Sequence, residues 1–290
     1  MSLEQVRTIG VVGAGQMGSG IAQVCAAAGF EVILQDAAPR ALEAAARTID
    51  KGLQRQVDKA ALSAADKGAI GKRIRPVADL AAVAECDFVI EAVTESLPVK
   101  RPIFETLDGQ ARGGVVLASN TSSLSITRIA AATRRPDRVI GMHFMNPVPV
   151  MALVEIVPGQ LTSPSTIEDT RALALRLGKT PVLSQDLPGF ISNRVLMPMI
   201  NEAICALHEG VGSREDIDTV MQLGMRHPMG PLALADFIGL DTCLAILDVL
   251  HAGFGDPKYR PCPLLRRMVD AGLFGRKSGR GFYDYADAKR

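Results

Sequence analysis

The feature that most constrains the fold is a glycine-rich turn close to the N-terminus. Residues 8–12, TIGVV, have the apolar and β-branched character of a buried strand, and GAGQMG follows with Gly13, Gly15 and Gly18 in G-x-G-x-x-G spacing. A helical stretch, SGIAQVCAAAG, begins there, and the next strand-like run leads to Asp36, eighteen residues after Gly18. The glycine pattern alone is a weak signal, but a preceding strand, a following helix and an acid at this spacing together predict a dinucleotide-binding unit.

Each part of this motif has a physical reason. We expect Gly13 to make the tight turn, Gly15 to let a pyrophosphate approach the backbone, and Gly18 to let helix and strand pack closely. The first helical residues supply N–H groups and a partial positive charge for phosphates. The predicted cofactor loop therefore consists of Gly13, Ala14, Gly15, Gln16, Met17 and Gly18.

Asp36 bears on the choice between the two nicotinamide dinucleotides. Its carboxylate can accept hydrogen bonds from the adenosine ribose hydroxyls and would repel a 2′-phosphate, which favours NAD. Arg40 lies nearby and could pair with such a phosphate, so NADP stays open as the less favoured cofactor.

The order of the remaining segments predicts an α/β fold with two domains. Strand-like runs alternate with helical stretches at residues 8–12, 31–35, 87–93, 115–119, 138–144 and 152–157. Continuous apolar strands separated by helices indicate a Rossmann-like, doubly wound, mostly parallel sheet. Beyond the sequence DLPGF we expect helices at residues 190–210, 213–225, 232–250 and 263–274, the second opened by a capping pair, Ser213 and Asp216. The predicted domains are an NAD-binding domain at 1–186 and an all-α substrate and dimerisation domain at 187–290.

Composition excludes several classes of function. A net charge of +1 and the absence of Trp argue against nucleic-acid binding. The longest apolar candidate for a membrane span contains Asp236, Asp241 and Asp248, so no membrane segment is expected. Five scattered cysteines without a C-x-x-C pair predict neither a disulfide framework nor a metal site. Because the N-terminus also lacks a basic signal region, we expect a soluble, cytoplasmic protein.

A proton-transfer pair is the second candidate site. His143 is one of four histidines and lies in the apolar run GMHFMNPVPVMALVE, which ends in Glu155. Pro147 and Pro149 cannot continue a central strand, so we expect the chain to turn around them. If the flanking strands pair antiparallel about residue 149, position 143 faces position 155, with Cβ atoms about 5 Å apart. A carboxylate there would orient the imidazole and stabilise its protonated form, as a base acting on an alcohol requires.

The residues alone leave a second interpretation of this pair open. His143 could be a core histidine bonded to the backbone, with Glu155 solvated at a strand edge. The other three histidines, His208, His227 and His251, lie in helical or loop segments without a similarly placed acid, and we interpret them as structural.

Five ordered stretches resemble the 3-hydroxyacyl-CoA dehydrogenases, particularly the short, single-function 3-hydroxybutyryl-CoA dehydrogenases. They are GAGQMGSGIA (13–22), SNTSSL (119–124), HFMNPVPVMALVEI (143–156), DLPGFISNR (186–194) and HPMGPLALADFIGLD (227–241), and KSGRGFYDY (277–285) closes the series. The set spans nearly the whole chain and is far more specific than its glycine motif. The resemblance favours the catalytic interpretation of His143. It implies NAD-dependent, reversible oxidation of an L-3-hydroxyacyl-CoA to the 3-ketoacyl-CoA, short-chain substrates and a place in fatty-acid or other lipid metabolism.

The resemblance also assigns roles to individual residues. The catalytic pattern of the family falls on Ser122, His143, Glu155 and Asn193. His143 would be the base and Glu155 would orient it, while Ser122 would bond the 3-oxygen of the substrate or the nicotinamide ribose. Asn193 would position the substrate near its thioester, although by residue type alone it could be a polar residue of a first helical turn. The expected cofactor contacts beyond the glycine loop are Asp36, Glu95, Lys100, Asn120, Ser122 and Lys277.

A cationic stripe is the candidate surface for the CoA part of the substrate. It consists of Arg47, Lys51, Arg55 and Lys59, which recur every four residues and would share one helix face. CoA phosphates could offset the mutual repulsion of these side chains, but so could Asp50 and Asp58, which would make the face merely solvated. Lys59 best matches a CoA-contacting position of the family, whereas Gly52 stands where some relatives have a contacting Ser.

Two other functions remain as alternatives. The chain could be a dehydrogenase of a free hydroxy acid or sugar acid, although the related enzymes use a catalytic Lys where this chain has Asn193 and Arg194. It could also be a non-catalytic nucleotide-binding relative. The apolar helices of the second domain exceed what a small domain needs, and the family implies a homodimer formed through them.

Overall fold

The computed structural model of the protein describes residues 5–285. Its contacts divide the chain into two compact units, with the boundary between Leu187 and Pro188, inside the sequence DLPGF. Each unit has a hydrophobic core of its own. The two units, here called the sheet unit and the helical unit, are described in turn.

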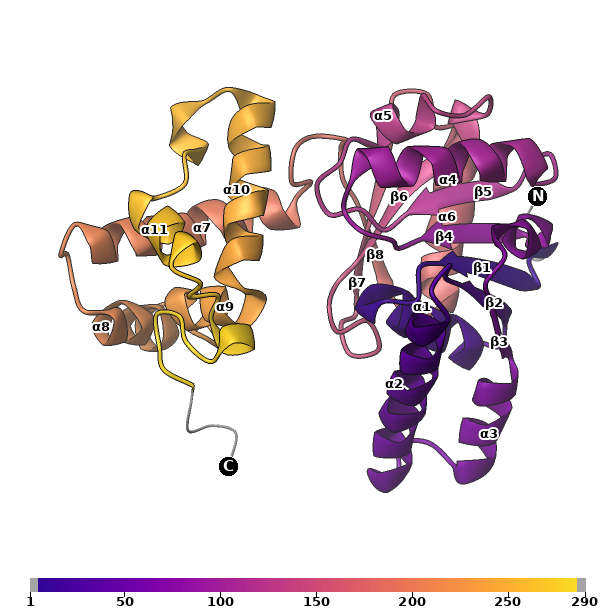
Figure 1. The fold of residues 1–290 in the computed structure, drawn as a ribbon, viewed down its shortest axis with the longest axis horizontal. Coiled ribbons are helices and arrows are strands. Elements are labelled where there is room, and N and C mark those ends of the chain that lie inside the picture. The colour runs from indigo at the N-terminus through magenta and orange to yellow at the C-terminus, as the bar shows by residue number, and fades with distance from the viewer. Residues whose placement is uncertain (1–4, 286–290) are drawn as a thin grey trace. The chain divides into compact units, whose positions relative to one another are not determined.

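The sheet unit is a doubly wound α/β domain with helices on both faces of one sheet (Figure 1). Its strands are β1 (Thr8–Val12), β2 (Glu31–Gln35), β3 (Ile74–Val77), β4 (Phe88–Glu91), β5 (Val116–Ser119), β6 (Val139–Phe144), β7 (Leu153–Pro158) and β8 (Thr180–Leu183). Its α-helices are α1 (Gln16–Ala27), α2 (Pro39–Asp58), α3 (Ala64–Lys72), α4 (Leu97–Gln110), α5 (Ile126–Ala130) and α6 (Pro164–Arg176).

The strand order is β3-β2-β1-β4-β5-β6-β7-β8. All neighbouring pairs are parallel except β6 and β7, which pair antiparallel. The chain winds outward from β1 through β2 to β3 and then returns to β4 on the other side of β1. Ligands of such sheets bind beyond the strand ends at this reversal. The predicted fold class is confirmed, and its ligand-binding edge lies between β1 and β4.

Two of the eight strands were not predicted from the sequence. β3 reads IRPV and β8 reads TPVL, and they are the two edge strands. Both carry a proline, which an edge strand tolerates because one side of its backbone needs no partner. Because no residue of either strand is buried, neither has the continuous apolar pattern that marked the central strands.

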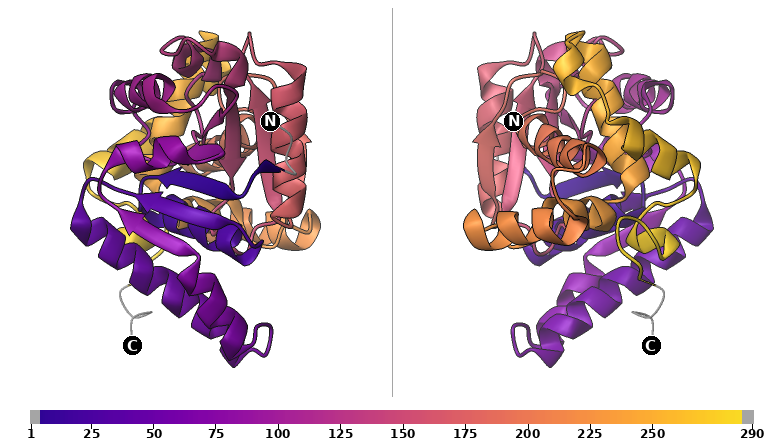
Figure 2. Two further views of the ribbon diagram at one scale, coloured as in Figure 1. Left: turned by 90° about the vertical axis from the view of Figure 1, so that its right-hand side faces the viewer. Right: turned by 90° about the vertical axis from the view of Figure 1, so that its left-hand side faces the viewer.

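Helices α2 and α3 pack on each other and project from the sheet (Figure 2). Only three residues of α2 are fully buried, Ala45, Ile49 and Leu53, which lie on one face at helical spacing. Most of the remaining helix surface faces solvent.

The helical unit contains the helices α7 (Ser192–His208), α8 (Arg214–Thr219), α9 (Pro231–Ile238), α10 (Leu240–Phe254) and α11 (Pro263–Asp270). The Oγ atom of Ser213 accepts from the N–H of Asp216 and donates to its carboxylate, which confirms the predicted capping pair. The expected single helix at 232–250 is wrong in one respect, since Gly239 divides it into α9 and α10. Gly239 has φ +105°, a conformation that glycine adopts readily and that ends α9.

Among residues 5–285, no helix is both long enough and apolar enough to span a bilayer.

Candidate active site

The glycine loop joins β1 to α1 with the geometry that its sequence predicts. Gly13 has φ +99° and donates its N–H to the carbonyl of Gln35 at 2.7 Å, which makes the turn. A Cβ atom on Gly18 would lie 1.7 Å from the carbonyl oxygen of Gly13, so only glycine fits there. A Cβ atom on Gly15 would meet nothing within 4 Å. The backbone at Gly15 is therefore open to a ligand, whereas the other two glycines serve the loop itself.

The N-terminus of α1 suits an anion. Within the described residues no side chain caps this helix and its first turn has no acid. The first N–H groups of a helix lack intrahelical acceptors and carry partial positive charge, so they can bind phosphate oxygens. The remaining loop residues lie differently: Ala14 is buried, Met17 packs against the core, and the exposed Gln16 donates its amide to the side-chain oxygen of Asn146 at 3.1 Å.

A cavity of about 570 Å³ opens beside this loop. Its lining includes Gly13 and Gly15, Asp36 after β2, and Ala92 and Val93 after β4. The carboxylate of Asp36 accepts hydrogen bonds from the N–H groups of Ala14 and Ala38, both at 2.9 Å, which fix its orientation. Arg40 is exposed on α2 and does not line the cavity. The open glycine, the uncapped helix and the fixed acid fit NAD, and the acid disfavours a 2′-phosphate.

A buried acid, Glu91, ends β4 and was not singled out from the sequence. Its carboxylate is fully buried and accepts from Lys100 Nζ at 2.6 Å, from Ser119 Oγ at 2.6 Å and from the N–H of Val93 at 2.7 Å. Lys100 is also fully buried. A charged residue closing the apolar run DFVI was the available signal, because buried carboxylates need a cation or several donors.

Glu95 lies in the loop after β4 and binds the loop that follows β5. Its Oε1 atom accepts from Thr121 Oγ1 at 2.6 Å, and from the N–H and Oγ of Ser122 at 2.8 and 3.1 Å. Lys100 Nζ lies 3.7 Å from its other oxygen. Burial alone would raise the pKa of Glu95, but the Lys100 charge and the hydrogen bonds from Thr121, Ser122 and Ser123 lower it below its ordinary value. Glu95 is thus a carboxylate that orients Ser122.

His143 and Glu155 face each other across β6 and β7. The two residues are register partners in the antiparallel pair, and His143 Nδ1 lies 2.7 Å from Glu155 Oε2. They are 8% and 1% exposed. The predicted pairing is confirmed. A carboxylate only accepts hydrogen bonds, so Nδ1 carries the proton and Nε2 is the ring nitrogen that can accept one.

Two asparagines make hydrogen bonds near the His143–Glu155 pair. Asn120, directly after β5, accepts from the N–H of Phe144 at 2.9 Å, which ties β5 to the residue after His143. Asn146 follows β6 and contacts Gln16 of the glycine loop, as described above. Asn146 was not among the predicted site residues, although its place three residues after His143 and next to a turn-forming proline was visible in the sequence.

Three further predicted site residues lie on other elements of the chain. Asn193, 8% exposed, is the second residue of α7, and its N–H donates to the carbonyl of Gly189 at 3.1 Å. Lys277, in the helical unit, binds the carboxylate of Asp241 at 2.5 Å. Lys59 is exposed and follows α2 as its C-terminal cap.

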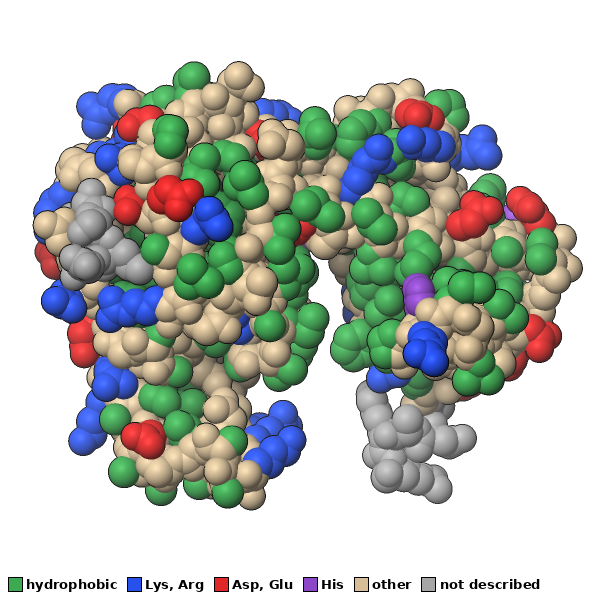
Figure 3. All heavy atoms as spheres, turned by 180° about the vertical axis from the view of Figure 1, so that it is seen from behind, with side chains coloured by type: hydrophobic (Ala, Val, Ile, Leu, Met, Phe, Trp, Pro, Cys, Tyr) green, Lys and Arg blue, Asp and Glu red, His purple; other side chains and the backbone are tan. Residues whose placement is uncertain are grey.

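The cationic stripe on α2 is exposed, and within the described residues Arg47 is its one member with a carboxylate partner, Glu43 at 3.9 Å. Asp50 pairs with Lys67 of α3 at 2.7 Å, and Asp58 accepts from Gln54. Within the described residues, Lys51, Arg55 and Lys59 have no carboxylate within 4.0 Å. Figure 3 shows Lys and Arg side chains on the surface that α2 and α3 form.

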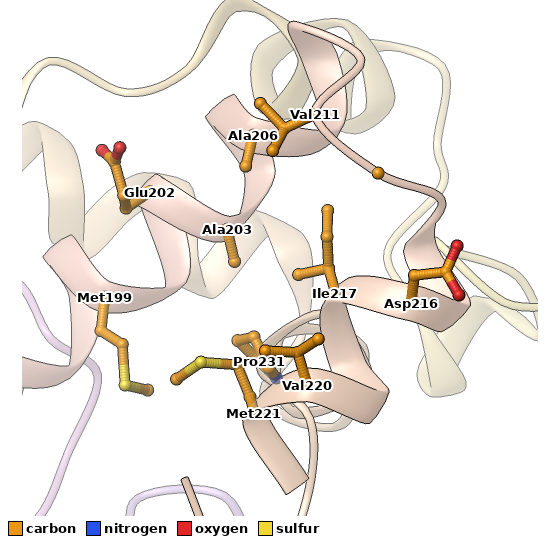
Figure 4. A pocket seen from close by; sticks show the side chains of 11 residues that line it. Met199, Glu202, Ala203, Ala206, Val211, Asp216, Ile217, Val220, Met221 and Pro231 are labelled. Atoms are coloured by element: carbon orange, nitrogen blue, oxygen red, sulfur yellow. The ribbon is translucent and has the colours of Figure 1, made fainter. Parts of the chain in front are cut away.

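The helical unit has an apolar pocket of about 470 Å³ between α7 and α8. Met199 and Ala203 face Ile217, Val220 and Met221 across it (Figure 4). Val211, which lines the pocket, and Leu223, two residues after Met221, are 75% and 80% exposed. Such a concentration of exposed apolar side chains is unusual on a monomer.

The doubly wound sheet, the glycine loop and the acid after β2 define a dinucleotide-dependent oxidoreductase. The family models for the 3-hydroxyacyl-CoA dehydrogenase NAD-binding domain and C-terminal domain match residues 8–187 and 189–285. The chain belongs to the 3-hydroxyacyl-CoA dehydrogenase family, and its cofactor is NAD.

Individual relatives agree with this assignment. The chain is 56% identical over 283 residues to a probable 3-hydroxybutyryl-CoA dehydrogenase of Bacillus subtilis, covering 98% of this chain and 99% of that protein. It is 53% identical to a 3-hydroxybutyryl-CoA dehydrogenase of Bradyrhizobium diazoefficiens, with 98% and 97% covered. The crystal structure of the (S)-3-hydroxybutyryl-CoA dehydrogenase PaaH1 of Ralstonia eutropha superposes with a TM-score of 0.94 at 51% identity, covering 97% and 99% of the two chains.

Proposed function

We propose that the protein oxidises the 3-hydroxyl group of (S)-3-hydroxybutyryl-CoA and of closely related short-chain L-3-hydroxyacyl-CoA thioesters, reversibly, with His143 as the base. The substrate is suggested by the names of relatives that match this chain over nearly its whole length. The catalytic part rests on one observation, the 2.7 Å contact between two buried side chains, His143 and Glu155.

His143 accepts the proton of the 3-hydroxyl group at Nε2, because Nδ1 is committed to Glu155. The C–O single bond becomes a carbonyl as the C3–H bond breaks. Bound NAD supplies the acceptor for the hydride that leaves C3. Glu155 stabilises the imidazolium that forms and keeps the ring from rotating. In the reverse direction, the imidazolium returns its proton to the 3-oxygen.

Ser122 is proposed to hydrogen-bond the 3-oxygen of the substrate or the nicotinamide ribose; because its hydroxyl donates to Glu95 in this structure, donation to the 3-oxygen requires that hydroxyl to rotate away from Glu95. Support comes from Glu95, whose oxygen holds both the N–H and the Oγ of Ser122 and so limits the freedom of this loop. Glu95, Lys100 and Asn120 are proposed to line the nicotinamide half of the site, and Lys277 is proposed as a further cofactor contact from the helical unit.

The CoA part of the substrate is proposed to bind the exposed stripe on α2, with Lys59 at its end. Three cations that lack a carboxylate partner in the described chain can pair with the phosphates of CoA. Asn193, on α7, is proposed to bind near the thioester. The sheet unit would thus be the NAD-binding domain and would also bind the phosphates of CoA, and the helical unit would be the substrate domain that binds near the thioester.

We also propose that the protein is a cytoplasmic homodimer that acts in fatty-acid or related lipid metabolism. The pocket between α7 and α8, together with Val211 and Leu223, is an apolar surface that a second copy of the chain would cover by presenting the same surface. Light scattering should report a dimer at micromolar concentration, and Val220→Glu should shift it toward the monomer. A monomeric native protein would refute the dimer.

The test of the catalytic proposal is His143→Gln, assayed with acetoacetyl-CoA by the loss of NADH absorbance. Turnover should fall by about 10³-fold or more, within the range that loss of a general base produces. The Kd of NADH, measured by fluorescence, should stay within about threefold of the native value, which corresponds to less than 1 kcal/mol of binding free energy. Turnover equal to the native rate would exclude His143 as the base.

The same reaction run in the oxidising direction, with NAD and followed by the appearance of NADH absorbance, separates the alternatives. Free 3-hydroxybutyrate and L-gulonate should be poor substrates beside the CoA thioester. NADH binding without turnover on four-, eight- or sixteen-carbon thioesters would instead indicate a non-catalytic relative.

A further inference from the structure

A buried lysine outside the proposed site contacts the segment that joins its two catalytic strands. Lys179 is 7% exposed and directly precedes β8. Its Nζ donates to the carbonyl oxygens of Val148 at 2.6 Å and Met151 at 2.8 Å. Both acceptors belong to residues 145–152, the β6–β7 connection, which leads from His143 to Glu155.

The local sequence directs Lys179 inward. Helix α6 ends in a Schellman motif, in which Gly178 has φ +71°, its N–H donates to Leu175, and the N–H of Lys179 donates to the carbonyl of Ala174. This ending turns the chain back toward the sheet. The next residue, Thr180, then donates its N–H to Ala152 at 2.7 Å and starts β8 alongside β7.

The β6–β7 connection also touches the cofactor loop and helix. A Cβ atom on Gly20 of α1 would lie 2.9 Å from Cβ of Val148, so the connection packs directly on the backbone of α1. Gln16 binds Asn146 at its start, and Val148 is 2% exposed. The connection therefore contacts both α1 and the ammonium group of Lys179.

Burial alone does not explain a cation in this place. Among the described residues no carboxylate lies within 4.0 Å of Lys179 Nζ, and burial lowers its pKa, an effect that Cys25 nearby partly opposes. Burying an ammonium group without a counter-ion is unfavourable, and an apolar side chain would fill the volume without that penalty. What the ammonium adds is two charge-assisted, directional bonds to the connection.

We propose that Lys179 is a positioning residue for catalysis: it fixes the β6–β7 connection against α1, and so sets where the His143–Glu155 pair stands relative to the cofactor loop. The inference rests on the proposed function, because it assumes that this pair is catalytic. Displacement of a reacting group by about 1 Å can lower a rate by roughly a hundredfold. Loss of the two bonds should therefore act on turnover.

The test is Lys179→Met, which keeps the length of the side chain and removes both donors. The number of folded sites is counted by titration with NADH, and kcat with acetoacetyl-CoA is expressed per NADH-binding site. We expect kcat per site to fall by roughly ten- to a hundredfold, with the KM of acetoacetyl-CoA changed much less. A merely structural lysine would reduce the number of sites and leave turnover per site unchanged, and that result would overturn the proposal.

Two further variants complete the design. Leu177→Ala, one residue beyond α6, removes buried apolar surface and leaves both donors of Lys179 in place, and its turnover per site should stay native. If Lys179→Met does not fold, Lys179→Gln takes its place, since Gln retains two N–H donors. Lys179→Gln should then keep more turnover per site than Lys179→Ala. Equal turnover per site in Lys179→Gln and Lys179→Ala would refute the role of the donors. His143→Gln is measured alongside. If it is inactive while Lys179→Met is native per site, only the present inference fails; if it is active, the proposed function itself fails.

Discussion

Replacement of Glu155 by Gln isolates the electrostatic part of the proposed mechanism. The shape of the side chain is kept, and its oxygen can still accept from His143 Nδ1 across the present 2.7 Å. What disappears is the negative charge beside the imidazolium. For charge centres about 4 Å apart, at an effective dielectric constant of about 20, their attraction is about 4 kcal/mol. At 1.36 kcal/mol per factor of ten, full loss lowers kcat about a thousandfold, and loss of half about thirtyfold.

The assay is steady-state turnover of acetoacetyl-CoA and NADH at saturating substrate. The Kd of NADH should remain within about threefold of the native value, a change below 1 kcal/mol. Glu31→Gln, at the exposed first position of β2, is the matched control and should keep native turnover. Native turnover in Glu155→Gln would refute the electrostatic reasoning. So would an NADH affinity that falls in parallel with kcat, since the variant would then have damaged the sheet rather than the chemistry.

Four further results are expected. Gly15→Ala should keep its free energy of unfolding within about 1 kcal/mol of the native value, because its Cβ meets no atom, yet it should bind NADH at least about tenfold more weakly. Gly18→Ala, whose Cβ would lie 1.7 Å from a carbonyl oxygen, should lower the free energy of urea unfolding by about 2 kcal/mol or more. Asp36→Asn should raise the Kd of NADH by about tenfold and lower that of NADPH, as measured by fluorescence titration. The pKa of Glu95 is lowered, so the stability that its carboxylate contributes is complete above the ordinary pKa of 4.5 and is lost as the pH falls below that value. The melting temperature of Glu95→Gln should therefore decline less than that of the native protein on acidification from pH 5 to pH 3.

The features that could be predicted from the sequence are those set by short-range geometry. The glycine loop follows from the spacing of three glycines between a strand and a helix. The contact between His143 and Glu155 follows because two prolines force a turn midway between them, and because opposite positions of an antiparallel pair lie side by side. Both features depend on residues close together in the chain.

The features that could not be predicted depend on contacts that no turn signal in the sequence announces, most of them between residues far apart in the chain. The edge strands β3 and β8 are recognisable only once β2 and β7 lie beside them, since their prolines argue against a strand. Glu91 and Lys100 have charged side chains that become buried because each finds the other after folding. Lys179 likewise has no local signal: its two acceptors lie 28 and 31 residues earlier in the chain.

The break between α9 and α10 illustrates a different limit. The run LALADFIGLDTCLAILDVL is apolar at helical spacing throughout, and a single glycine inside a helix is often tolerated. The helix ends at Gly239 because the N–H of the next residue, Leu240, donates to the carbonyl of Phe274, which comes from a later part of the chain. A tertiary hydrogen bond here overrides the local pattern.

The most direct measurement is a crystal structure of the protein with NAD and acetoacetyl-CoA, a pair that cannot react with each other. If the imidazole of His143 is the proton acceptor in alcohol oxidation, its Nε2 atom will stand at hydrogen-bonding distance, about 2.6–3.2 Å, from the 3-oxygen of the ligand, while Nδ1 stays on Glu155. A 3-oxygen bound by other groups, with the imidazole of His143 out of reach, would contradict the account.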